Sequence, residues 1–239
     1  MLGLGVGFYD LARSPYISSF SNKYSLSFDG SNDHIDVDTT LGPDINPATG
    51  TISAWVKLNT TSTTAQILSA RRDSNNIIQL FYHAGSNEMR AIYKGDGTTK
   101  TANVDSGETI ENSSNWHHIA MTWDTGEGNV KIYQDGELKE TTAGIVEFSG
   151  DPPNKCDIGK SSGGDTAYFN GNIDELSVFT EVVNIETLYN SGVIKDLSGE
   201  SGLVGYYRFE EGSGSSAIDS SGNNNTGTIN GATYSTDLP

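Results

Sequence analysis

Short runs in which apolar and polar residues alternate constrain this chain more than any other feature of its sequence. In Thr51–Leu58 (TISAWVKL) the apolar residues occupy every second position, and Ser53, Trp55 and Lys57 stand between them. A period of two residues is that of a β-strand with one face directed to a core. Strands are predicted for Tyr24–Phe28, His34–Val37, Thr51–Leu58, Gln66–Ala70, Asn76–Tyr82, Glu88–Lys94, His117–Trp123, Val130–Gln134, Lys155–Gly159, Asn172–Phe179 and Leu203–Phe209.

Turn signals separate these runs. The pair Asp135–Gly136 favours a tight hairpin turn, because both residues adopt positive φ at low cost. One short helix is predicted over Asn184–Asn190, where Asn184 can cap the first turn and Ser191–Gly192 can end it. Many short strands with turns between them are typical of a sandwich rather than of βαβ units. We therefore expect an all-β fold: a two-sheet antiparallel jelly-roll sandwich with one short helix.

The charge of the chain restricts its partners. The net charge is −17, from 31 acidic and 14 basic residues, and a field of that sign repels phosphate backbones. Nucleic acid is therefore excluded as an expected partner. The acidity suits capture of Ca²⁺, or it serves only solubility. No apolar run approaches the roughly 18 residues that cross a bilayer, so membrane insertion is not expected. Cys156 is the only cysteine, and no intramolecular disulfide can form.

No break in composition divides the chain, and we expect one domain over residues 24–239 after an N-terminal arm, residues 1–23. Residues 203–239 are expected to return to the same sandwich, because so short a segment cannot bury a core of its own. The alternative is that they begin a second, truncated repeat. The start of the chain has neither the basic region nor the apolar run of a secretory signal peptide. This predicts a cytoplasmic protein, or one that leaves the cell without the Sec route.

Five segments carry a family resemblance when they are taken together. They are Ser25–Val37, Thr51–Leu58, Trp116–Thr141, Cys156–Val178 and Leu203–Ala232. The set resembles the laminin-G-like jelly-roll family within the concanavalin A-like lectin/glucanase fold. The last segment commonly precedes the first in this family, whereas here it ends the chain.

The layout is also similar to jelly-roll proteins encoded by marine bacteriophages. The resemblance implies a non-catalytic binding or display domain on a virion surface, with carbohydrate or another host surface ligand as its partner. The arm, residues 1–23, would then contact capsid or tail proteins. The alternative is a capsid decoration or fibre protein that is purely structural and binds no glycan.

An acidic loop is the candidate metal site. Asp29, Asn32 and Asp33 gather oxygen atoms within five residues, which suits Ca²⁺ coordination. The resemblance implies a structural calcium near this loop. Asp174 is predicted to share a strand face with the apolar Leu176, where a carboxylate must be paired, hydrogen-bonded or metal-bound. The alternative is that Asp29 and Asp33 cap turns while Asp174 accepts backbone N–H bonds.

Aromatic residues supply the candidate ligand site. Trp55 lies on the polar side of its strand, where an exposed indole can stack on a sugar ring, and Tyr82 and Tyr93 would extend this platform. The alternative is that Trp55 packs under a loop or the short helix. Trp116 and Trp123 are assigned to the core.

Catalysis is not expected. Retaining glucanases of the fold it resembles carry carboxylates in alternation on one strand, which places them on one face. No Glu-x-Asp-x-Glu spacing occurs in the sequence, and the adjacent acids Asp174 and Glu175 are expected to diverge. A glycan-active enzyme is therefore the least favoured interpretation.

Overall fold

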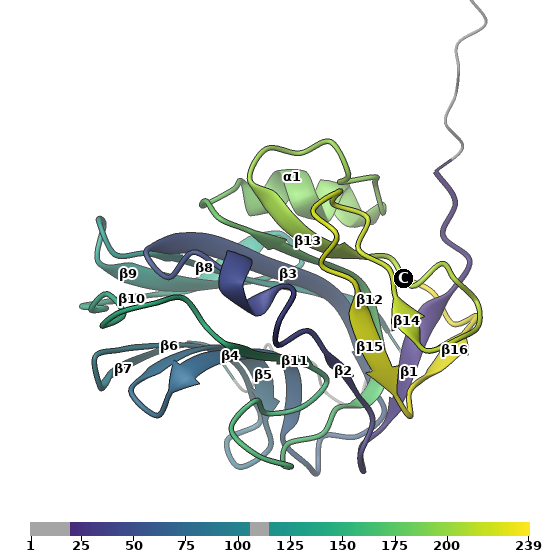
Figure 1. The fold of residues 1–239 in the computed structure, drawn as a ribbon, viewed down its shortest axis with the longest axis horizontal. Coiled ribbons are helices and arrows are strands. Elements are labelled where there is room, and N and C mark those ends of the chain that lie inside the picture. The colour runs from purple at the N-terminus through teal and green to yellow at the C-terminus, as the bar shows by residue number, and fades with distance from the viewer. Residues whose placement is uncertain (1–19, 106–114) are drawn as a thin grey trace, which may run out of the picture.

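Two antiparallel sheets face each other in the computed structural model, which describes residues 20–105 and 115–239 (Figure 1). In spatial order the first sheet holds β10 (Glu137–Ala143), β9 (Asn129–Gln134), β8 (His117–Asp124), β3 (Thr49–Leu58), β12 (Asn170–Phe179), β1 (Ser25–Asp29) and β16 (Thr233–Ser235), and β13 (Leu203–Tyr207) also pairs with β12. The second holds β14 (Ser216–Ala217), β15 (Gly227–Asn230), β2 (His34–Asp36), β11 (Lys155–Ile158), β4 (Ala65–Asp73), β5 (Asn76–His83), β6 (Glu88–Gly95) and β7 (Thr98–Val104). The expected all-β, two-sheet sandwich is confirmed.

The main core lies between the two sheets and follows from the alternation in the sequence. Ile52, Ala54 and Val56 of β3 point into it, as predicted, and each is fully buried. Burial of side chains as large as Ile52 and Val56 contributes about 1.5–3 kcal/mol each. Trp123 also lies in this core, and its Nε1–H donates to the carbonyl of Asn46. The predicted place of Trp123 is confirmed.

A second, smaller core covers the outer face of the first sheet. Helix α1 (Ile185–Tyr189) lies on that face (Figure 1). Asn184 caps α1 through its side chain, as predicted, by accepting from the N–H of Glu186. The apolar residues of this cluster are Ala120, Phe179, Ile185, Leu188, Leu197, Leu203 and Tyr206. The centre of the first sheet is therefore buried on both faces.

The C-terminal segment contributes strands to both sheets. β13 pairs with β12 and β16 pairs with β1 in the first sheet, while β15 pairs with β2 in the second. Tyr207 and Phe209 are fully buried within the main core. Residues 203–239 thus complete the sandwich at the edges of the N-terminal strands (Figure 1).

A β-bulge in β12 corrects one prediction. Asp174 pairs with Trp55 and Ser177 pairs with Ser53, so the two residues between them oppose a single residue of β3. Glu175 takes the bulge conformation at φ 49°. Alternation restarts after it, and Leu176 faces the core while Asp174 lies on the outer face beside Trp55. The predicted shared face of Asp174 and Leu176 was wrong.

Most predicted strands are confirmed with small shifts at their ends, and the Asp135–Gly136 hairpin turn has the expected positive φ values of 51° and 81°. Five strands, β7, β10, β14, β15 and β16, were not predicted. Short 3₁₀ turns occur at Gly42–Asp44 and Asn190–Gly192. No helix in the described part of the chain has the length and apolar character needed to span a bilayer.

Candidate functional site

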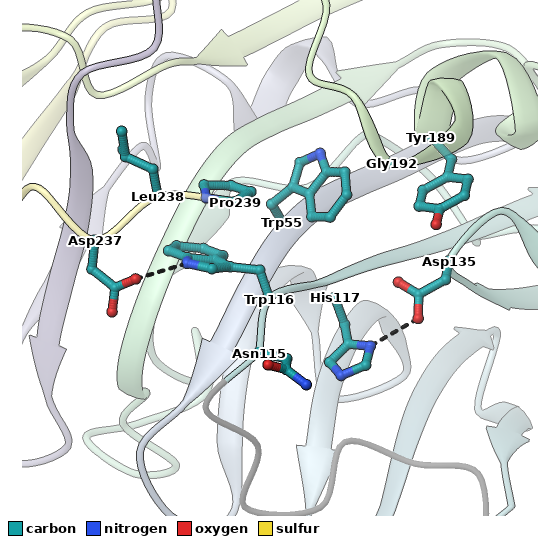
Figure 2. A pocket seen from close by; sticks show the side chains of 10 residues that line it. All are labelled: Trp55, Asn115, Trp116, His117, Asp135, Tyr189, Gly192, Asp237, Leu238 and Pro239. Atoms are coloured by element: carbon teal, nitrogen blue, oxygen red, sulfur yellow. Dashed lines mark hydrogen bonds and ion pairs between the residues drawn. The ribbon is translucent and has the colours of Figure 1, made fainter.

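A groove of about 510 Å³ opens on the outer side of the first sheet, near the end of α1 (Figure 2). It is lined by Trp55, Asn115, Trp116, His117, Asp135, Tyr189, Gly192, Asp237, Leu238 and Pro239. Aromatic rings and carboxylates thus share one concave surface, and five separate parts of the chain supply them.

Sheet pairing and turn chemistry place these side chains. Trp55 on β3 is paired with His118 on β8, and the neighbouring Trp116 and His117 also line the groove. Asp135 belongs to the β9–β10 hairpin turn, and its carboxylate accepts from the N–H of His118 at 2.9 Å. The hairpin is therefore tied to β8, and its acidic residue is fixed at the groove.

Three aromatic side chains form the apolar part of the groove. The Trp55 ring lies 5.9 Å from the ring of Tyr189 and 5.5 Å from that of His118, and Trp55 is 7% exposed. Trp116 is half-buried. Gly136 makes room for Tyr189, because a Cβ at this glycine would lie 2.6 Å from the ring atom Cδ1. Trp55 thus packs beside the short helix, as one of the two alternatives expected, and it also lines the groove, where its contact with a ligand stays a prediction.

Asp237 is held by an indole and a lysine. It accepts from Trp116 Nε1–H at 3.0 Å through Oδ1 (Figure 2). Its Oδ2 accepts from Lys57 Nζ at 2.6 Å. Burial raises its pKa, but the bonds from Lys57 and Trp116 outweigh this and hold the pKa below its ordinary value. Asp237 is therefore ionised at neutral pH, and it fixes the orientation of the Trp116 indole.

Asp135 is held by two neighbouring histidines. His117 Nδ1 lies 2.8 Å from Asp135 Oδ2 (Figure 2). The backbone N–H of His118 donates to the other oxygen. Burial lowers the pKa of His118 to about 4, against the opposing effect of Asp135. His118 is consequently neutral at physiological pH and supports the Trp55 ring as an aromatic neighbour.

This arrangement suits a ligand with two kinds of surface. Indole and phenol rings favour contact with a flat apolar face. Ionised carboxylates accept hydrogen bonds and cannot donate them, so they favour hydroxyl or N–H donors on the ligand. The groove therefore fits a molecule that presents an apolar face and several hydroxyl groups.

The structure does not assemble the predicted aromatic platform. Tyr82 and Tyr93 lie on β5 and β6 of the other sheet, are fully buried in the main core and cannot reach the face that holds Trp55. The phenol of Tyr93 donates to the carbonyl of Pro47 at 2.7 Å, and the phenol of Tyr82 donates to Asn87. Alternation in β5 and β6 turns both rings inward. Trp116, which was assigned to the core, lines the groove instead.

The predicted metal residues are not brought together. Asp174 lies on β12 opposite Trp55, whereas Asp29 at the end of β1 pairs with Asn170. Asp29 Oδ1 accepts from the N–H groups of Ser31 and Asn32, as a turn cap does.

Asp33 completes the same turn. Its Oδ2 accepts from the Asp29 N–H at 2.9 Å, and Gly231 packs so closely that a Cβ there would lie 2.0 Å from Oδ1. Among the residues that the structure describes, no group of three or more His, Cys, Asp or Glu side chains could hold a metal ion. The four-residue calcium site therefore does not fit, and cation binding by Asp29, Asn32 and Asp33 alone stays a prediction.

The β12 bulge holds two buried acids instead. Asp174 accepts from Asn22 Nδ2–H at 2.8 Å, and Tyr206 donates to Glu175, whose other oxygen lies 3.6 Å from Arg208 Nε. Burial, reinforced by the neighbouring charge of Glu175, raises the pKa of Asp174 to about 8, and burial raises that of Glu175 to about 7. The charge of Glu175 thus acts on Asp174, whereas the expected divergence of the two side chains stays a prediction.

The fold and the groove define an all-β jelly-roll sandwich with an aromatic surface site. Residues 29–187, more than half of the chain, match the laminin-G-type family described as the Concanavalin A-like lectin/glucanases superfamily. The chain belongs to this family. Comparison with curated proteins finds no match to the sequence.

Solved structures share the fold at low sequence identity. A candidate carbohydrate-binding protein from Bacteroides ovatus is 19% identical with a TM-score of 0.67, and the match covers 90% of this chain but 60% of that one. The carbohydrate-binding module, CBM40, of a Ruminococcus gnavus sialidase is 16% identical with a TM-score of 0.56, over 70% and 96% of the two chains. Domain 4 of an arabinanase from Geobacillus stearothermophilus, solved with arabinotriose, is 19% identical with a TM-score of 0.55, over 71% and 76%.

Proposed function

We propose that this protein is a non-catalytic carbohydrate-binding domain and that the groove at Trp55, Trp116 and Tyr189 holds the sugar. The observation that carries the proposal is a hydrogen bond in the groove: the Trp116 indole N–H donates to Asp237 at 3.0 Å. An oriented indole next to an ionised acceptor offers both contacts that a pyranose or furanose ring requires.

The family and its solved relatives support a sugar as the ligand. The Ruminococcus module has been solved with α2,3-sialyllactose, and the Geobacillus domain with arabinotriose. Two domains of the same fold, each part of a larger enzyme, have thus been solved with an oligosaccharide bound. The groove of the present chain offers the aromatic and polar groups for the same task.

The positions of the carboxylates favour binding over catalysis. In the groove, Asp135 and Asp237 are each engaged by neighbouring cationic or N–H groups of the protein. The buried pair Asp174 and Glu175 is 0% and 3% exposed, and a substrate cannot reach it in this conformation. A hydrolase would need a carboxylic acid and a carboxylate on either side of an accessible bond.

Calorimetric titration against neutral and acidic oligosaccharides tests the proposal. We expect at least one to bind, and Trp116→Ala to weaken that binding about tenfold or more, because the variant loses the stacking surface. Tyr168→Ala is the matched control: this half-buried aromatic lies near His34, away from the groove, and its loss should leave affinity unchanged. The proposal would be contradicted if both variants lost affinity equally. It would also be contradicted if the unchanged protein bound none of the oligosaccharides.

We also propose, from the sequence, that the domain is displayed on a virus particle through its N-terminal arm. Residues 1–19 of the expected arm lie outside the described residues. Asn22 donates to Asp174 of β12, and the N–H of Lys23 donates to Glu210, which follows β13. A deletion that ends at residue 19 leaves both contacts in place. Particles assembled with residues 1–19 deleted should lack the protein, whereas normal incorporation would contradict display through the arm.

A further inference from the structure

We propose that the groove selects uncharged glycans and discriminates against those that carry a sialic or uronic acid at the bound position. This inference rests on the proposed function, since it names the class of sugar that the same groove accepts. Three features support it: the acidic side chains of the groove, the ion pair that already occupies the nearby Lys57, and the negative net charge of the chain.

Among the residues that the structure describes, the lining of the groove contains two acidic side chains, Asp135 and Asp237, and neither Lys nor Arg. Recognition of a sugar carboxylate ordinarily uses such a cation, and Arg is favoured because its planar group bonds both oxygens. A ligand carboxylate placed here would instead face ionised Asp237. Two like charges about 4 Å apart repel each other even in bulk water, and we expect this repulsion to weaken binding about fivefold.

The cation that reaches this carboxylate is already engaged. Lys57 Nζ lies 2.6 Å from Asp237 Oδ2, and its side chain is 19% exposed. Recruiting Lys57 for an acidic sugar would break this ion pair and leave Asp237 uncompensated beside the ligand. His117 is engaged in a comparable way, because its Nδ1 lies 2.8 Å from Asp135 Oδ2.

The remaining groups suit hydroxyl donors. Asp237 holds its charge at neutral pH, and carboxylates accept hydrogen bonds from hydroxyl groups without a change in ligand charge. Trp116 and Tyr189 contribute aromatic rings, which favour contact with the apolar face of a sugar. The net charge of −17 adds a long-range field that opposes the approach of anionic glycans.

A matched glycan panel tests the inference. Each neutral oligosaccharide is paired with a derivative that carries sialic or glucuronic acid on the same core, and affinities are measured at 50 mM and 500 mM NaCl. We expect neutral members to bind about fivefold or more tightly than their acidic partners at low salt, with a smaller ratio at high salt because the charges are screened. Asn115→Lys, which adds a cation to the exposed rim of the groove, should reduce this ratio, and Asn115→Gln is its neutral control.

The outcomes separate the inference from the function beneath it. Acidic members that bind as tightly as neutral ones, or more tightly, would overturn the inference and leave carbohydrate binding intact. Binding to no member of either set would remove both. A ratio that Asn115→Lys and Asn115→Gln change equally would also contradict the electrostatic origin of the selection.

Discussion

At the residue scale, the groove depends on side chains whose positions are fixed by their neighbours. Trp116 is oriented by Asp237, and Asp135 is held by the His118 N–H. The ring of Tyr189 packs so closely against Gly136 that a side chain at this position would clash with it. A glycine that looks like an ordinary hairpin residue in the sequence therefore shapes the groove.

The role of Gly136 can be separated from its backbone conformation. Gly136→Ala places a Cβ 2.6 Å from the Tyr189 ring at φ 81°, whereas Gly128→Ala adds a Cβ with no neighbour within 4 Å at φ 71°. Both changes should cost about 1 kcal/mol for the left-handed backbone. We expect Gly136→Ala to cost about a further 1 kcal/mol and to weaken sugar binding, as measured by urea unfolding and titration. Equal effects of the two variants on binding would show that Tyr189 does not depend on this space.

Sequence reasoning found only part of the site at this scale. Trp55 was identified because a large aromatic residue interrupts the polar side of its strand. Trp116, Tyr189 and Asp237 were not, because the contacts that join them to Trp55 link residues more than 60 positions apart. Tyr82 and Tyr93 were misplaced, since an aromatic residue at a strand position has the same pattern whether it faces the core or the solvent.

At the element scale, the bulge in β12 has the largest consequences. It reverses alternation at Glu175 and directs Asp174 away from the main core. Alternation of apolar and polar residues cannot reveal such a bulge when the surrounding residues do not alternate strictly, as in Ile173–Phe179. The prediction for Asp174 failed for this reason.

The buried acids predict a pH dependence of stability. In the folded protein the pKa of Asp174 is about 8 and that of Glu175 about 7, both above their ordinary values near 4. The folded state therefore holds more protons than the unfolded state across this interval, and stability must fall as pH rises through it. We expect the free energy of unfolding to decrease by more than about 1 kcal/mol between pH 5 and pH 8.

Two variants distinguish the acids from the rest of the chain. Asp174→Asn should flatten the decline in stability and stabilise the protein at pH 8, because the neutral amide has no charge to bury. Asp165→Asn removes a carboxylate whose side chain is 85% exposed and should leave the slope unchanged. Urea unfolding curves at several pH values measure both, and a slope unaffected by Asp174→Asn would contradict the assignment.

At the scale of the whole molecule, the last strands close the sandwich. The fold class, most central strands and the short helix could be predicted, because alternation, turn residues and a capping Asn are local signals. The short strands β14, β15 and β16 could not, because they are two to four residues long and form only through pairing: β16 with β1, β15 with β2, and β14 with β15. Such short segments have no pattern of their own.

Truncation tests this closure. A chain of residues 20–202 would expose the core around Ile35 and Val37 and lose Tyr207 and Phe209, a deficit comparable with the roughly 5–15 kcal/mol that stabilises a domain. We expect no cooperative thermal transition for residues 20–202, whereas residues 20–239 should retain one. An independently folded 20–202 chain would favour the alternative that residues 203–239 begin a second repeat.

The central claim, that the groove binds carbohydrate, is tested most directly by the indole resonances of the three tryptophans. In a ¹⁵N–¹H spectrum recorded during titration with a binding oligosaccharide, the Trp55 and Trp116 Nε1–H signals should shift with the same saturation curve. The Trp123 signal should stay in place, because its Nε1–H is bonded to Asn46 inside the core. A titration that binds sugar but leaves Trp55 and Trp116 unshifted would place the site elsewhere and contradict the account.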